Sequence, residues 1–121
     1  MLTYDDLVLH ARNTLGEFEK QYQKELRKDS IDGDSGAHTV FSLVFVPLLE
    51  KALRTDDSLA KTFFDYIELM ETEGDQHVSE VAEFTVLEEL LDNVKGTEFK
   101  QYMGPNTLEA YRQIRRYIIN D

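Results

Sequence analysis

The sequence contains no cysteine, so disulfide bonds, thiolate metal sites and cysteine nucleophiles are all excluded. This lack fits a reducing compartment such as the cytoplasm. Its most apolar run, Val40 to Leu49, is 10 residues long and includes Pro47, whereas a membrane-spanning helix needs about 20 residues. Two aspartates precede the first apolar cluster, where a secretory signal would carry a positive region. We therefore predict a cytoplasmic protein without a membrane segment.

Basic residues are scarce. The chain has 13 lysines and arginines against 24 aspartates and glutamates, and its net charge is −11. A nucleic-acid backbone or an anionic membrane would repel such a protein, so the expected partner is a basic protein. The length of 121 residues predicts a single domain, 1–121. A content of 41% hydrophobic and 31% charged residues excludes a disordered acidic tail.

Motifs for catalysis and metal binding are also missing. The sequence has no GxxxxGK[ST], GxGxxG or GxSxG pattern, so phosphate-binding loops and nucleophile elbows have no support. Its histidines, His10, His38 and His77, stand singly and form no HExxH or ExxH pair of the kind found in zinc or di-iron sites. Residues 28–37 are rich in Asp and Gly but lack the spacing of a calcium loop. We predict a non-enzymatic protein with no metal and no cofactor.

The spacing of apolar residues predicts an all-α fold with five main helices and no strand. The predicted helices cover about 3–28, 38–54, 59–73, 76–94 and 108–119, and 97–103 form a short helical turn. Short connections predict antiparallel hairpins. Either a HEAT-like stack or a compact orthogonal bundle is consistent with these signals.

Several residues are expected to begin, end or distort these helices. Thr3 and Asp75 are predicted N-caps, because their side-chain oxygens can accept hydrogen bonds from free backbone N–H groups. Gly74 is expected to end the helix before Asp75, and Gly96 the one after it. Pro47 removes one backbone hydrogen bond, so the second helix is expected either to kink there or to start afresh with the proline in its first turn, and we favour a kink.

Negative charge is concentrated in one segment. Residues 56–92 contain twelve acidic residues and a single base, Lys61, whereas acids and bases cancel in the rest of the chain. Five of these acids are spaced by three residues on two of the predicted helices: Asp65, Glu68, Glu71, Glu80 and Glu83. Like charges so placed repel by a few tenths of a kcal/mol per pair. The segment is either a solvated helix face or an acidic surface that binds a basic partner.

Residues 46–107 combine several features in a fixed order. A leucine- and glutamate-rich helix is followed by an acidic break, a Phe-x-x-Ile-Glu helix, a Gly-Asp turn, a Val-Leu-Glu-x-Leu helix and a Gly-Pro pair. In this order the chain resembles small all-helical, HEAT-like bacterial proteins of the immunity type, which are encoded beside polymorphic or contact-dependent toxins. The resemblance implies an inhibitor without catalytic residues that binds a toxin at or beside its active site.

The leading hypothesis is therefore a toxin-neutralising immunity protein that is a monomer when free. Its basic partner would be a nuclease-type toxin whose cationic face contacts the acidic helices. The predicted interface consists of Asp65, Glu68, Glu71, Glu80 and Glu83, with Phe64 or Tyr66 as an aromatic anchor between the acids. The alternative is a HEAT-like scaffold or adaptor subunit that assembles a complex through its apolar helices.

Overall fold

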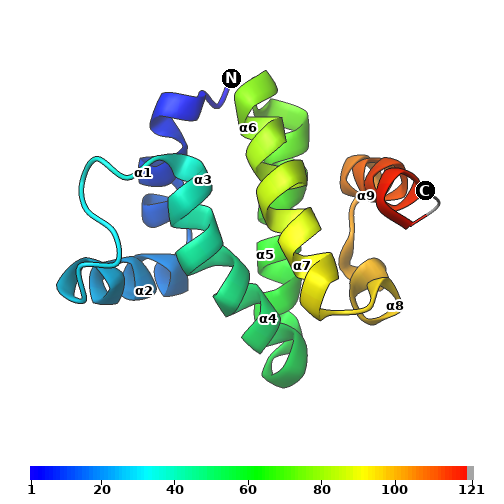
Figure 1. Ribbon diagram of the computed structural model, residues 1–121, viewed down its shortest axis with the longest axis horizontal. Coiled ribbons are helices and arrows are strands. Elements are labelled where there is room, and N and C mark those ends of the chain that lie inside the picture. Colours follow the sequence, from blue (N-terminus) through cyan, green and yellow to red (C-terminus); the bar gives the residue numbers. More distant parts are fainter. Residues whose placement is uncertain (120–121) are drawn as a thin grey trace.

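The computed structural model describes the backbone of residues 1–119 and the side chains of residues 1–115, and this part of the chain is all-helical (Figure 1). The elements are α1 (Tyr4–Thr14), α2 (Gly16–Arg27), α3 (Ala37–Val40), the π-helix η1 (Phe41–Phe45), α4 (Val46–Thr55), α5 (Asp57–Glu73), α6 (Gln76–Glu80), the π-helix η2 (Val81–Leu87), α7 (Glu88–Asn93), α8 (Gly96–Phe99), the 3-10 helix η3 (Lys100–Tyr102) and α9 (Pro105–Ile119). No strand occurs among residues 1–119, where the one β-type contact is an isolated bridge between Leu2 and Gly74. The predicted all-α class is confirmed. None of the described helices combines the length and apolar character needed to cross a membrane.

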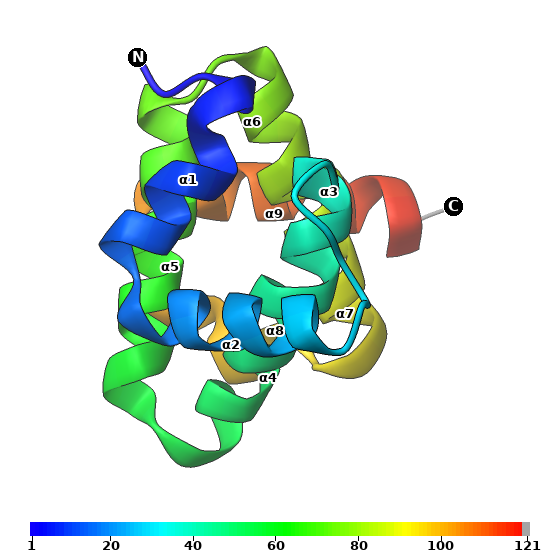
Figure 2. The same ribbon diagram turned by 90° about the vertical axis from the view of Figure 1, so that its left-hand side faces the viewer.

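The first predicted helix, 3–28, is in fact two helices. Leu15 has extended backbone angles and separates α1 from α2, although its N–H donates to Ala11 and its carbonyl accepts from Glu19. Leu15 is itself buried, so the spacing of core residues along the sequence continues across the break. Gly16 directly follows and is a poor residue for a helix interior. The chain therefore changes direction here while its core positions are kept, and α2 crosses the direction of α5 (Figure 2).

The second predicted helix runs through Pro47 without ending. Its irregularity is the π-helix η1, in which the Val46 N–H donates to the Phe41 carbonyl five residues back. Pro47 follows in the first turn of α4, the position where a missing N–H is best tolerated. The distortion that we expected at Pro47 is thus a π-helical segment immediately before it.

The predicted helix 76–94 is also continuous and contains the π-helix η2 between α6 and α7. The two π-helices pack against each other. His38 Nδ1 lies 2.6 Å from Thr85 Oγ1, and Ser42 Oγ donates to Glu89 Oε1 at 2.7 Å, so two polar contacts join the paired helices beside this packing. The helix ends at Asn93, and Gly96 begins α8 instead of ending the helix before it, which corrects the prediction.

The N-caps predicted at Thr3 and Asp75 are both confirmed. Thr3 Oγ1 accepts from the Asp6 N–H at 3.3 Å, and Asp75 accepts from the Val78 N–H at 2.9 Å. The hydrogen bond from Val78 is the main reason why the pKa of Asp75 lies below its usual value. Gly74 ends α5 as expected.

The core is a single cluster of buried apolar residues around α5, rich in aromatic rings. Phe45 of η1 has its ring centroid 4.7 Å from that of Phe63 on α5 and 5.1 Å from that of Phe41. On another side of α5, Phe64 stacks on Phe99 and Tyr102 of the α8–η3 segment. The α9 helix runs across α5 and contacts both α5 and η2 (Figure 2). The acidic segment 56–92 therefore comprises the central helix α5 and the adjacent helix that runs from α6 to α7.

Candidate functional site

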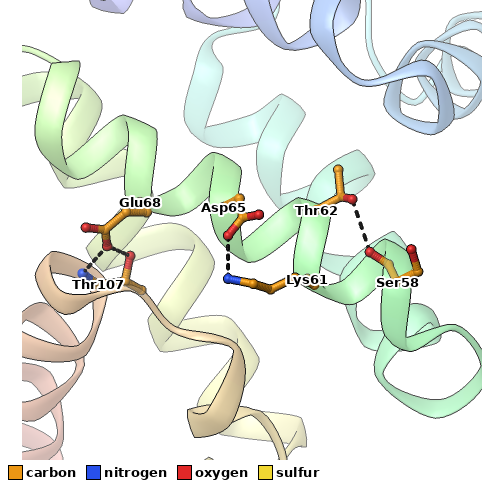
Figure 3. A network of polar contacts seen from close by, with 6 residues as sticks. All are labelled: Ser58, Lys61, Thr62, Asp65, Glu68 and Thr107. Carbon is orange, nitrogen blue, oxygen red and sulfur yellow. Dashed lines mark hydrogen bonds and ion pairs between the residues drawn. The ribbon is translucent and has the colours of Figure 1, made fainter.

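The acids of α5 differ in what they contact (Figure 3). Asp65 is exposed, and its Oδ1 lies 2.6 Å from the Nζ of Lys61, the single base of the acidic segment. Such an exposed pair stabilises a helix by no more than about 0.5 kcal/mol. Asp65 therefore lies at the surface with its carboxylate paired to Lys61.

Glu68 serves the fold itself. Its Oε1 accepts from the N–H and the hydroxyl of Thr107, both at 2.8 Å (Figure 3). Its Oε2 accepts from the side chain and the N–H of Asn106 at 2.8 and 3.2 Å. Burial alone would raise the pKa of Glu68, but these four hydrogen bonds outweigh it and lower the pKa. Glu68, a residue of α5, therefore caps the N-terminus of α9. The sequence does not reveal this role, because Glu68 lies 39 positions before Thr107 in the chain.

The approach of Glu68 to this turn also explains one glycine. A Cβ atom on Gly104 would lie 2.6 Å from the Cδ and Oε1 of Glu68. That is closer than non-bonded atoms tolerate, so any side chain at position 104 would displace the carboxylate from the α9 N-terminus. The Gly-Pro pair thus gives the carboxylate access and starts α9 at Pro105.

Glu71 is largely buried, one turn further along α5. Its Oε2 has no hydrogen-bond partner, and its neighbours are the carboxyl group of Glu83 on η2 and the hydroxyl of Ser79. Burial, followed by the adjacent Glu83 carboxyl, raises the pKa of Glu71 to about 9. Glu71 is consequently neutral at physiological pH, and it adds no charge to a surface that would attract a basic partner.

Glu80 and Glu83 belong to the second acidic helix. Glu80 lies 3.0 Å from the Nδ1 of the exposed His77 and forms an ion pair with it when the histidine is protonated. Glu83 is partly exposed on η2, next to Phe84. Of the five predicted contact acids, the structure thus leaves Asp65 exposed and Glu80 and Glu83 partly exposed, although the Glu83 carboxyl also adjoins Glu71. Glu68 and Glu71 are engaged within the fold.

The predicted aromatic anchor is contradicted by burial. Phe64 is 0% exposed and stacks between the Phe99 and Tyr102 rings. Tyr66 is 3% exposed, and its hydroxyl contacts His10 Nδ1 at 2.8 Å, while burial raises its pKa. Neither ring can reach a partner without unfolding of the core. Both were expected between the acids because they adjoin Asp65 in sequence, but neighbouring residues on a helix point in different directions.

A groove between η2 and α9 contains an aromatic residue that is accessible. The groove has a volume of about 420 Å³ and is lined by Glu83, Phe84, Glu88, Gln113 and Ile114. Five of the seven residues of η2 are buried, and the remaining two are the neighbours Glu83 and Phe84. Phe84 is 55% exposed. Its ring therefore forms part of the groove instead of the core.

Carboxylates continue from the groove along α7. Burial, followed by the negative charge of Asp92, raises the pKa of Glu88. Glu83, Glu88 and Asp92 form what we call the acidic edge, which follows η2 and α7 next to Phe84. Sequence reasoning missed Phe84 and Glu88 as site residues. No local signal in the sequence identifies them, because the residues of η2 that face outward are set by its packing against other helices.

The sequence of the chain matches a known protein family. A family described as a domain of unknown function, DUF7674, matches residues 9–118. The chain belongs to this family. The match covers every helix that bears the acidic segment and the groove. No curated protein and no solved structure matches the chain.

Among residues 1–115, no three His, Asp or Glu side chains lie close enough together to hold a metal ion. His10, His38 and His77 instead contact Tyr66, Thr85 and Glu80, respectively.

Proposed function

We propose that this DUF7674 domain is a non-enzymatic binding protein that neutralises a bacterial toxin by holding a basic surface of the toxin against its acidic helices. The observation that supports the proposal most is the charge of residues 56–92, which carry twelve acids and one base on adjacent helices. That base, Lys61, is already paired with Asp65. A field of one sign accelerates the approach of an oppositely charged protein and excludes partners of like charge.

The arrangement of the helices supports the same proposal. The likeness of residues 46–107 to immunity-type proteins extends over α4 to η3, which include both acidic helices. Because α2 and α9 run across α5 (Figure 2), we favour a compact orthogonal bundle over a HEAT-like stack. An inhibitor needs only such a rigid body with a charged face, and a cationic nucleic-acid-binding surface of a nuclease-type toxin is the complementary partner.

The test is capture followed by a toxicity assay. The tagged protein is used to retain partners from a lysate of its own host at low and at high salt, and the retained proteins are identified by mass spectrometry. We expect a basic protein that is retained at low salt and lost at high salt. Expression of that protein alone should stop growth, and co-expression with this chain should restore it. A retained protein that is harmless alone would contradict the immunity proposal.

Charge variants identify the surface that binds. The double variant Glu88→Lys and Asp92→Lys reverses two acids of the acidic edge, whereas Asp5→Lys and Asp34→Lys make the same change in net charge outside residues 56–92. We expect the first pair to slow association with the captured protein at least about ten-fold and the second pair to have much less effect. Recovery of a salt-resistant assembly of several subunits, equally retained by both variants, would instead favour a scaffold subunit.

A further inference from the structure

Phe84 is a large apolar side chain that the fold leaves in water. It is 55% exposed, whereas five of the other six residues of η2 are buried. Single exposed apolar residues are common, but Phe84 lies at the wall of a groove. The buried Ile114 and the polar Gln113 of α9 form the opposite wall. The exposed apolar surface of the groove is therefore supplied mainly by Phe84.

The polar groups around this groove carry one sign of charge. Glu83 and Glu88 line it, and among the side chains of residues 1–115 no lysine or arginine does so. Of the α9 bases whose side chains the structure describes, Arg115 donates to the hydroxyl of Tyr111 at 2.9 Å, and Arg112 Nη1 lies 4.0 Å from Glu109 Oε2. In contrast, a hollow of about 430 Å³ between α4 and α5 includes both Lys51 and Asp56 and has no such bias.

We propose that the Phe84 groove binds an apolar side chain of a basic segment of the partner protein, with lysine or arginine residues of that segment held by Glu83 and Glu88. This inference rests on the proposed function, because it supplies the aromatic contact for the same basic partner. A second copy of the chain is a poor occupant, since its net charge of −11 would meet an acidic groove. An anionic membrane is repelled for the same reason.

A few central aromatic residues dominate binding, while surrounding charges set the rate of approach and the choice of partner. Phe64 and Tyr66 are buried, so neither supplies an apolar contact beside the acids of α5. Phe84 is the exposed aromatic residue next to the acidic edge, so it is placed to convert an electrostatic encounter into a short-range contact.

The experiment titrates the ¹⁵N-labelled protein with two synthetic amphipathic peptides of equal length, one of leucine and lysine and the other of leucine and glutamate. We expect the lysine peptide to shift the amide resonances of residues 83–88 and 113–114 most strongly. The glutamate peptide should leave them unchanged. Phe84→Ala should weaken the lysine peptide about ten-fold. Leu9→Ala, which truncates a residue of the same 55% exposure on α1, should leave the affinity within about two-fold.

Each other outcome contradicts the inference in a distinct way. In one such outcome, Phe84→Ala binds the lysine peptide as tightly as the wild type does, while Glu88→Lys with Asp92→Lys abolishes binding. The groove is then refuted, and the acidic-surface function stands. If neither peptide shifts residues 83–88, the groove is refuted and the capture experiment alone decides the function. If sedimentation shows a dimer that Phe84→Ala dissociates, the occupant is a second copy. Amide dispersion of Phe84→Ala, and of Glu88→Gln as a second variant, verifies that the fold is retained.

Discussion

Glu71 shows how one residue can look like a surface acid in the sequence and behave as a buried neutral group in the fold. It follows Glu68 at a spacing of three residues, as a solvated helix face would require. Packing of η2 against α5 nevertheless places it beside Glu83 and leaves its Oε2 buried without a partner. Two carboxyl groups in contact cannot both be ionised without a large repulsion, so Glu71 keeps its proton.

This arrangement predicts how stability depends on pH. The pKa of Glu71 is about 9 in the folded protein, above its ordinary value of 4.5. The stability from the neutral carboxyl is therefore complete below pH 4.5 and is lost as the pH rises toward 9. Glu71→Gln should match the wild type near pH 5 and be more stable near pH 9 by about 1–3 kcal/mol, the usual effect of a buried unsatisfied group.

Urea unfolding at pH 5, 7 and 9 measures this difference. The control is Glu73→Gln, an exposed residue of the same helix, which should follow the wild type at every pH. If the free energies of unfolding of Glu71→Gln and Glu73→Gln depend on pH in the same way, Glu71 does not carry the extra proton.

At the scale of elements, the contact between α5 and α9 depends on Glu68. A helix leaves its first N–H groups without intrahelical partners, and a carboxylate there also interacts favourably with the helix dipole. Glu68 supplies that carboxylate through four hydrogen bonds to Asn106 and Thr107. The connection from α7 through α8 and η3 is thus held to α5 where α9 begins.

We expect Glu68→Ala to destabilise the protein by about 1–2 kcal/mol, the usual effect of losing an N-cap. Hydrogen exchange at the amides of Asn106 and Thr107 should accelerate, because both lose their acceptor. Asp65→Ala is the matched control on α5 and should change the unfolding free energy by less than about 0.5 kcal/mol, since its pair with Lys61 is exposed. Equal effects of the two substitutions would show that Glu68 has no special role at α9.

The elements also show how far the sequence can be taken. Apolar spacing predicted the helices from 38 to 94, and side-chain chemistry predicted the caps at Thr3 and Asp75, because both are local signals. The break at Leu15 was missed because the apolar spacing continues through it. The cap from Glu68 was missed because it joins residues almost forty positions apart, and no local pattern records such a contact.

For the molecule as a whole, the sequence predicts the acidic character of the surface, but it does not predict which residues form the candidate site. The charge of residues 56–92 is a property of composition, and the structure keeps Asp65, Glu80 and Glu83 accessible within it. Which acids are free and which aromatic residue is exposed depend on tertiary packing. Phe64 and Phe84 are both aromatic residues next to an acid, yet one is completely buried and the other is 55% exposed.

The concentration of like charge predicts that added salt stabilises this protein. Self-repulsion among the acids opposes the compact state, and 0.5 M NaCl reduces the Debye length to less than about 5 Å. The opposing term is the loss of ion pairs, but most of these are exposed, and Arg12 with Glu19 at 2.7 Å is partly shielded from screening. Repulsion therefore dominates, and the free energy of unfolding should rise by roughly 1 kcal/mol between 0.01 and 0.5 M NaCl, several like-charge pairs being relieved at once.

Urea unfolding at the two salt concentrations measures the gain. Glu88→Gln with Asp92→Gln removes two charges of the acidic edge and should reduce the dependence on salt, because less repulsion is left to screen. Asp5→Gln with Asp34→Gln removes the same net charge outside residues 56–92 and should reduce it less. A stability that falls with salt would mean that attractive pairs such as Arg12 with Glu19 outweigh the acidic segment. A field that acts between acids of the fold also acts on an approaching base, so such a fall would weaken the case for electrostatic attraction of a basic partner.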